Sequence, residues 1–250
     1  MDELTAQNKR AWEYRAYEHW NRLATPAEKA QELIQDPLAA IRFHEQEFEH
    51  VRGLSVANVC GSNGRRAVAI ALLGARTTVF DISAENCRYA LELARAAGVS
   101  LDYVLGDFCQ TAPAYAGAFH IAYMEGGILH YFPDLPRFTR LLYAILKPGG
   151  RLILSDFHPF RKLDPANPAC EQCAGDYFDR GIHTGDLAYK PFFPAAERAD
   201  FPPCRLRYYT LEEILDAVLD AGFVLRRFRE VPDWGEGKRP GEFVIYAGKP

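Results

Sequence analysis

The stretch Val56-Ala-Asn-Val-Cys-Gly-Ser-Asn-Gly-Arg65 constrains the fold of this chain more than any other segment. Its first residues are typical of a buried strand, the Gly/Ser/Asn residues are typical of a tight turn, and Ala67–Leu73 continues as an apolar helix. Asp81 follows seventeen residues after Gly64 and ends a second strand-like run, Thr77–Phe80. A strand, a turn at a helix N-terminus and an acid ending the next strand predict a doubly wound α/β domain.

The same unit predicts a site for the adenosine part of a ligand. Small residues in the turn let the backbone approach a ligand, and the helix N-terminus offers free N–H groups. Asp81 can hold both hydroxyls of a ribose. Several adenosine-containing ligands are compatible with this segment.

From residue 55 the chain alternates between strand-like and helix-like segments. We expect strands near 55–60, 76–81, 101–105, 118–124, 150–156, Phe223–Val231 and Glu242–Ala247, and helices near 64–73, 84–97 and 134–146. A capping box, Thr210-Leu-Glu-Glu213, opens a last helix that Gly222 ends. This alternation predicts a Rossmann-like sheet of seven strands, mostly parallel.

Residues 1–50 show no strand alternation and predict a helical cap before the sheet. One helix is expected over 11–20. Thr25-Pro26 and Asp36-Pro37 each combine an N-cap residue with proline at the first helical position, so each predicts a further helix.

Residues 157–208 are rich in proline and aromatic residues and have no clear period. An irregular segment of this length inside a domain is typical of a functional lid or insertion. We therefore expect a cap over 1–50 and one domain over 51–250 that contains this insertion after the fifth strand.

Composition narrows the partners. The net charge of −4 gives no global positive field, which makes nucleic acid an unlikely partner. The chain shows no signal peptide and no apolar run near 18 residues, from which we expect a cytoplasmic protein without a membrane partner. Its six scattered cysteines do not suggest a disulfide scaffold. The oligomeric state cannot be deduced from these features.

With these elements placed, the chain resembles the class I S-adenosylmethionine-dependent methyltransferases over roughly 50–156 and 209–250. In that family the first strand and its turn read acid–x–Gly–x–Gly–x–Gly. The aligned residues here are Asn58, Cys60, Ser62 and Gly64, of which only Gly64 matches.

Later segments of the chain match the family better. Asp81 stands where the family's acid binds ribose, and Asp107-Phe108 follows the third strand, where an acid and an apolar residue hold adenine. Met124–Asp134 resembles the segment after strand four, and Lys147-Pro-Gly-Gly150 resembles the turn into strand five. The reversed last strand of that family's sheet also suits the two strands that end this chain.

The resemblance implies S-adenosylmethionine as cofactor and S-adenosylhomocysteine as product. The residues expected to contact the cofactor are Asn58, Cys60, Gly61, Ser62, Gly64, Asp81, Ile82, Asp107, Phe108, Met124 and Glu125. Asn58 replaces the family's acid and can still accept one hydrogen bond from the cofactor's amino group. Cys60 is expected to be a small residue beside the sheet rather than a nucleophile.

Methyl transfer from a sulfonium depends mainly on in-line positioning, which can supply roughly 7–11 kcal/mol. Candidates for a general base lie at the carboxyl ends of strands four and five: Glu125, His130, Asp156 and His158, with Glu125 and His158 preferred. The acceptor is expected to be a small molecule, contacted by Tyr14, Tyr17, His130 and Tyr177. No motif identifies the nucleophilic atom.

Acceptor specificity is expected to lie in the two additions to the sheet, the cap and the insertion, which together would roof the active site. Both are rich in aromatic residues, namely Trp12, Tyr14, Tyr17 and Trp20 in the cap and Tyr177, Phe178, Tyr189, Phe192 and Phe193 in the insertion. Part of this set would simply attach the additions to the sheet.

Three alternatives remain at this stage. A nicotinamide-dependent dehydrogenase shares the turn and the acid, but the turn lacks the Gly-x-Gly-x-x-Gly spacing. A cofactor-binding protein without catalytic activity would also tolerate a degenerate turn. Cys170-x-x-Cys173 with His183 or Cys204 could hold zinc, but one CxxC falls short of the usual four ligands, so we predict no metal.

Overall fold

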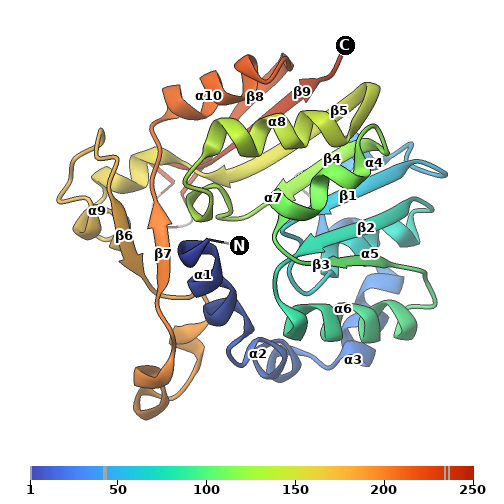
Figure 1. Ribbon diagram of the computed structural model, residues 1–250. Coiled ribbons are helices and arrows are strands. Elements are labelled where there is room, and N and C mark those ends of the chain that lie inside the picture. The colour runs from blue at the N-terminus through green and yellow to red at the C-terminus, as the bar shows by residue number, and fades with distance from the viewer. Residues whose placement is uncertain (1, 42–43, 234, 236) are drawn as a thin grey trace.

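A twisted sheet of seven strands forms the centre of the protein in the computed structural model, which describes residues 2–41, 44–233, 235 and 237–250 (Figure 1). The strands are β1 (Ser55–Val59), β2 (Arg76–Asp81), β3 (Asp102–Leu105), β4 (Phe119–Glu125), β5 (Leu146–Phe157), β8 (Val224–Pro232) and β9 (Pro240–Gly248). Their order is β3-β2-β1-β4-β5-β9-β8, and β9 runs antiparallel to both of its neighbours. The predicted fold class, with its reversed last strand, is confirmed.

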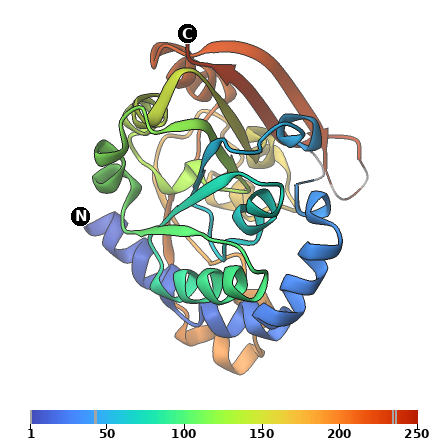
Figure 2. The same ribbon diagram turned by 90° about the vertical axis from the view of Figure 1, so that its right-hand side faces the viewer.

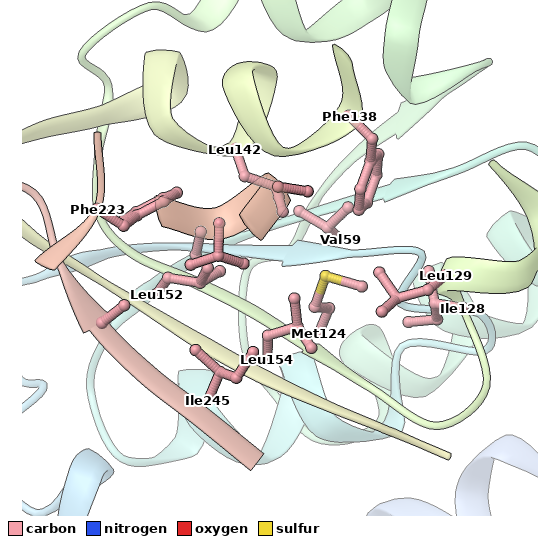
Figure 3. Close-up of a cluster of buried hydrophobic side chains, with 14 of the residues drawn as sticks. Val59, Met124, Ile128, Leu129, Phe138, Leu142, Leu152, Leu154, Phe223 and Ile245 are labelled. Carbon is pink, nitrogen blue, oxygen red and sulfur yellow. The ribbon is translucent and has the colours of Figure 1, made fainter. Parts of the chain in front are cut away.

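Helices cover both faces of this sheet. They are α4 (Glu45–Phe48), α5 (Arg65–Leu72), α6 (Ala84–Ala96), α7 (Phe108–Thr111), α8 (Leu135–Ile145) and α10 (Leu211–Asp220), with 3-10 turns η2 (Ala112–Tyr115) and η3 (Leu129–Tyr131). On one face Phe138 and Leu142 of α8 pack over strand residues such as Val59 (Figure 3). On the other face Ile70 of α5 and Phe48 of α4 belong to a second buried cluster. The predicted capping box at Thr210 starts α10.

The cap is helical but divided differently from the prediction. Its elements are α1 (Glu3–Glu13), α2 (Ala16–Leu23), α3 (Pro26–Gln35) and the 3-10 turn η1 (Pro37–Ala40). The single helix expected over 11–20 is wrong, because Arg15 adopts a left-handed conformation (φ 56°) between α1 and α2. Arg15 forms ion pairs with Glu18 and with Glu197 of the insertion, which offset the cost of this conformation. The third helix expected from Asp36-Pro37 is only the turn η1.

The insertion has local structure that its sequence did not predict. It contains a two-stranded antiparallel sheet, β6 (Ile182–Gly185) with β7 (Cys204–Arg207), the helix α9 (Pro168–Gln172) and the 3-10 turns η4 (Pro159–Leu163), η5 (Lys190–Phe192) and η6 (Ala195–Asp200). The six cysteines of the chain are free. None of the helices in the described part of the chain is long and apolar enough to cross a membrane.

Helix α1 joins the insertion to the sheet. It lies beside β7 in Figure 1, and Figure 2 shows the cap helices gathered along the same end of the molecule as α6. The side chain of Asn8 donates to the carbonyl of Arg205 (3.0 Å) and accepts from its N–H (2.7 Å). The hydroxyl of Tyr189 donates to the carbonyl of Tyr14 (2.9 Å). The cap and the insertion therefore form one continuous layer beside the sheet.

Candidate active site

The turn between β1 and α5 is packed tightly on Asn58. A Cβ atom at Gly61 would lie 2.5 Å from Asn58 Oδ1, so no larger residue fits there without a shift. Cys60 and Ser62 have positive φ values of 51° and 50°. The N–H of Ser62 donates to Asp81 Oδ2 (3.0 Å), which ties the turn to the end of β2. The turn and the predicted ribose acid are thus one hydrogen-bonded unit.

A cavity of about 480 Å³, here called the turn cavity, opens above this unit. It is lined by nine of the residues predicted to contact a cofactor: Asn58, Cys60, Gly61, Ser62, Asp81, Ile82, Asp107, Phe108 and Glu125. The two other predicted residues are not part of its lining. Gly64 instead allows α5 to approach α6, since a Cβ there would lie 2.7 Å from that of Ala90. Met124 is fully buried in the core among aliphatic side chains (Figure 3).

Two buried oxygen atoms in this unit have no hydrogen-bond partner among the described residues. They are Asn58 Oδ1 and Ser62 Oγ, both beside the turn cavity. The amide nitrogen of Asn58 donates to the carbonyl of Tyr123 (3.3 Å), which fixes Oδ1 as the free acceptor. Because a buried unpaired acceptor is costly, these atoms fit a ligand that carries hydrogen-bond donors, such as an ammonium group.

Burial shifts the pKa values of several groups that line the turn cavity, among them Asp81 and Cys60. It raises the pKa of Asp81, although N–H donors from Ser62 and Ser83 oppose the shift. It also raises the pKa of the Cys60 thiol well above its usual range, so this thiol is uncharged at neutral pH. The expectation that Cys60 is not a nucleophile agrees with this environment. Asp107 caps α7 by accepting from the N–H of Cys109 (2.9 Å).

Glu125 is held by an ion pair at the wall of the turn cavity. Its Oε1 accepts from Arg66 (2.6 Å), and its Oε2 accepts from the hydroxyl of Tyr123. His44 lies behind this pair with Nε2 3.6 Å from the carboxylate, and burial lowers the pKa of His44 to about 4. Arg65 also lines the cavity, and its guanidinium has no hydrogen bond or ion pair with the described residues. The sequence analysis did not predict roles for Arg65 and Arg66. Their position in the first turn of α5 was the one feature that could have indicated them.

A second cavity of about 670 Å³, here called the insertion cavity, lies between the sheet and the insertion. It is lined by His130, Asp156 and His158 from the sheet side and by residues such as Leu206 and Tyr208 from the insertion. The two cavities share five residues: Trp12, Gly126, Gly127, Tyr131 and Ala188. They therefore meet at a common rim formed by α1, the segment after β4 and the insertion.

The polar groups predicted as bases have partners of their own. Asp156 accepts from the N–H groups of Ile128 and Leu129 (2.8 Å each), so it holds the segment after β4 in place. His158 Nδ1 accepts from the N–H of Phe160 (3.2 Å), and its Nε2 lies 3.2 Å from Glu230. Burial lowers the pKa of His158.

Among the residues predicted to bind an acceptor, His130 lines the insertion cavity, and burial lowers its pKa to about 3. The three tyrosines line neither cavity and instead attach the additions to the rest of the protein. Tyr17 donates to Glu92 (2.5 Å), and Tyr177 accepts from a backbone N–H at the start of α10 (2.9 Å). The ring of Tyr14 packs edge-on against an insertion ring at 4.9 Å.

The CxxC motif does not supply two neighbouring ligands in the described residues. Cys173 forms a cluster with Asp179 and His183, whose ligand atoms lie within 4.8 Å of one another, while Cys170 and Cys204 stand outside it. The Nε2 atom of His183 is hydrogen-bonded to Asp179 and lies 4.0 Å from Cys173 Sγ. Three ligand atoms remain fewer than a structural zinc site requires.

The fold and the turn cavity together define a Rossmann-like protein that binds an adenosine-containing cofactor at the carboxyl ends of its strands. A model of the methyltransferase domain family matches residues 58–154. The ubiquinone biosynthesis O-methyltransferase of Xanthomonas axonopodis pv. citri (strain 306) is 31% identical over 170 residues, which span 66% of this chain and 69% of the relative.

Solved structures agree on the fold. An S-adenosylmethionine-dependent methyltransferase from Mesorhizobium loti aligns with a TM-score of 0.61 at 18% identity, over 84% of this chain and 97% of the other. Magnesium protoporphyrin IX methyltransferase from Synechocystis PCC 6803, solved with bound S-adenosylhomocysteine, aligns with a TM-score of 0.64 at 15% identity over 100% of both chains.

The chain belongs to the class I S-adenosylmethionine-dependent methyltransferases. It is an enzyme of that family, and S-adenosylmethionine is its cofactor. The dehydrogenase and the non-catalytic binding protein are thereby set aside.

Proposed function

We propose that this enzyme methylates a hydroxyl group of a small molecule bound in the insertion cavity. One observation carries the proposal: the turn cavity and the insertion cavity meet at a rim that includes Trp12, Gly127 and Tyr131. Ligands that fill both cavities would face each other there, which is the positioning that methyl transfer needs. The 31% identical relative is named an O-methyltransferase, which supports oxygen as the methylated atom.

In this proposal the residues of the turn cavity bind the cofactor, which supplies an electrophilic methyl group when bound. Asp81 binds the ribose hydroxyls, and Asp107 with Phe108 binds the adenine. Asn58 accepts from the amino group through its unpartnered Oδ1. Arg65 lines the cavity without an ion pair to the described residues, and it faces the carboxylate of the methionyl part.

His130 is the side chain that best suits the acceptor hydroxyl. It lines the insertion cavity next to the shared residue Tyr131, and its lowered pKa keeps the ring uncharged and able to accept a hydrogen bond. Of the bases preferred from the sequence, Glu125 forms an ion pair with Arg66, and His158 has its Nε2 atom 3.2 Å from Glu230. We therefore propose that these two residues position their neighbours rather than take the proton.

The cap and the insertion form the roof of both cavities in this proposal. Trp12 of α1 and Ala188 of the insertion line each cavity, and the ring of Trp12 packs on those of Tyr131 (5.8 Å) and Tyr189 (5.7 Å). Such a layer would exclude water from the rim. The cytoplasmic location expected from the sequence stays a prediction.

The test is methyl transfer by the purified full-length protein. It would be incubated with S-adenosylmethionine and matched sets of small aromatic acceptors that carry a hydroxyl, a thiol or an amine on the same ring. Production of S-adenosylhomocysteine and a methylated product by mass spectrometry are the measurements, with Asp81→Asn as the cofactor-binding control. We expect turnover of hydroxylated acceptors that is lost in Asp81→Asn.

Two results would overturn the proposal. Transfer to thiols or amines with none to hydroxyls would refute oxygen as the nucleophile. Tight binding of S-adenosylhomocysteine with transfer only to protein or RNA would refute the small-molecule acceptor.

A further inference from the structure

The insertion cavity contains two cations that lack an ion-pair partner among the described residues. Arg161 and Lys162 both line it and belong to the turn η4 at the start of the insertion. The guanidinium of Arg161 lies over the ring of Phe157, with Cζ 3.8 Å from the ring centre, and makes no hydrogen bond within the described chain. Lys162 Nζ makes one long hydrogen bond, to the carbonyl of Asp179 (3.4 Å), and lies 5.2 Å from the ring of Tyr177.

The acids near Arg161 do not neutralise it directly. Asp156 is in the same cavity, but its carboxylate accepts from the backbone N–H groups of the segment after β4. Asp164 is paired with Arg239 (2.7 Å), and Glu242 lies near Arg161 without an ion pair. Burial lowers the pKa of Arg161, a sign that its charge is partly removed from water. A guanidinium in this state gains most from an anion brought by a ligand.

The surroundings of Arg161 suit a planar acceptor. Phe157, Tyr208 and Tyr209 line the same cavity and provide aromatic surface. A guanidinium presents paired N–H donors that match the two oxygens of a carboxylate. His130 lies in the same cavity and forms no ion pair with the described residues, so it is free to face a neutral hydroxyl rather than the anion.

We infer that the acceptor is an aromatic hydroxy acid, whose carboxylate is bound by Arg161 in the insertion cavity while its hydroxyl faces the shared rim. This inference rests on the proposed function and makes it more specific. Lys162 adds positive charge to the same region. Arg161 is thus the residue that selects anionic over neutral acceptors.

The experiment measures binding and turnover separately. A panel of hydroxylated benzoates, phenylacetates and cinnamates would be paired with the corresponding neutral carboxamides and with the aryl sulfonates. Dissociation constants would be measured by calorimetry on the full chain in the presence of S-adenosylhomocysteine. The proteins are the parent, Arg161→Met, Arg161→Lys and, as a matched control, Arg140→Met, which removes an exposed arginine from α8.

In the parent, at least one acid should bind about tenfold or more tightly than its amide, as expected for a charge-assisted bidentate contact. Arg161→Met should abolish this preference, Arg161→Lys should retain part of it, and Arg140→Met should leave it unchanged. All variants should bind S-adenosylhomocysteine as the parent does, which shows that they are folded. A preference for sulfonates over carboxylates would show that the site is specific for another anion, which would overturn the assignment of a carboxylate.

The inference fails if no acid in the panel binds better than its amide, or if the preference survives in Arg161→Met. These failures are distinct from failure of the proposed function. Methylation of neutral amides as efficiently as acids would refute the anion site and leave hydroxyl methylation intact. Arg161-dependent binding of acids without any methyl transfer would refute hydroxyl methylation and leave the anion site intact.

Discussion

Replacing Gly61 by alanine tests whether the turn cavity is built around Asn58. The new Cβ would lie 2.5 Å from Asn58 Oδ1, 2.8 Å from its Cγ and 3.0 Å from Val79 Cγ1. Gly61 does not have a positive φ, so the substitution adds no backbone strain and its effect is steric. Overpacking of this kind costs about 1–3 kcal/mol, and we expect the free energy of unfolding of Gly61→Ala to fall by that amount.

A second substitution tests whether the clash with Asn58 causes this loss of stability. Asn58→Ala removes the atoms that the new methyl group would meet, at the cost of the hydrogen bond to Tyr123, roughly 1 kcal/mol. Of these three close contacts, the double variant keeps the one with Val79. Gly61→Ala should therefore cost less in the Asn58→Ala background than in the parent, by about 1 kcal/mol or more.

Urea denaturation followed by circular dichroism measures the free energy of unfolding of the parent, the two single variants and the double variant. Calorimetry with S-adenosylhomocysteine adds a second outcome: the steric cost of Gly61→Ala is relieved in the double variant, but the affinity is not restored, because Asn58 Oδ1 is gone. Gly248→Ala is the matched control, since the three atoms nearest to its Cβ all belong to the flexible end of Arg226, the closest at 3.3 Å. If the losses of the two single variants add up to that of the double variant within about 0.5 kcal/mol, Gly61 and Asn58 do not share this space and the packing argument is refuted.

Three further predictions concern charged groups. Asp81→Asn should weaken S-adenosylhomocysteine binding about tenfold or more. Because burial raises the pKa of Asp81, the affinity of the parent should fall as the pH drops through a value above 3.8. An affinity that calorimetry finds to be independent of pH would contradict this. Arg65→Met should weaken S-adenosylhomocysteine by about tenfold and leave 5′-methylthioadenosine, which lacks the amino-acid part, unchanged; equal losses for both ligands would remove Arg65 from the carboxylate site. In the folded protein the pKa of His44 is about 4, against 6.5 for an unperturbed histidine, so the unfolded chain binds this proton first as the pH falls. Stability on the order of 3 kcal/mol is therefore lost between pH 6.5 and pH 4. His44→Phe should flatten that part of the unfolding free energy against pH, and an unchanged slope would show that other groups cause it.

The parts of the site that the sequence predicted are those encoded by position along the chain. Asp81 and Asp107 follow strands β2 and β3, and parallel strands bring their carboxyl ends to one edge of a sheet. Local order alone therefore places both acids beside the turn. Gly64 lies outside the lining of the turn cavity, which the sequence could not indicate, because a glycine in such a turn can serve either a ligand or helix packing and Ala90 lies 26 residues away. Met124 also lies outside this lining, and strand alternation does not reveal which face a neighbouring helix covers.

The insertion cavity could not be predicted in this way. Its walls come from α1, the segment after β4 and the insertion, which are far apart in sequence and carry no periodic pattern. The aromatic content suggested a roof but not which rings face inward: Trp12 lines both cavities, whereas Tyr14 and Tyr17 attach the cap. The break at Arg15 was equally hidden, because its partner Glu197 lies 182 residues away.

A chain of hydrogen bonds links the two cavities through the cap. Asp81 accepts from the N–H of Ser83 (3.0 Å), and the hydroxyl of Ser83 donates to the carbonyl of Trp12 (2.9 Å). Asp81, the acid proposed to bind ribose, is therefore connected through two hydrogen bonds to Trp12, which lines the insertion cavity. A cofactor that held Asp81 would also hold the end of α1 that carries Trp12, and an ordered Trp12 would complete the wall against which an acceptor packs. We therefore expect the cofactor to bind before the acceptor, because the hydrogen bonds that hold the acceptor's wall lead back to Asp81.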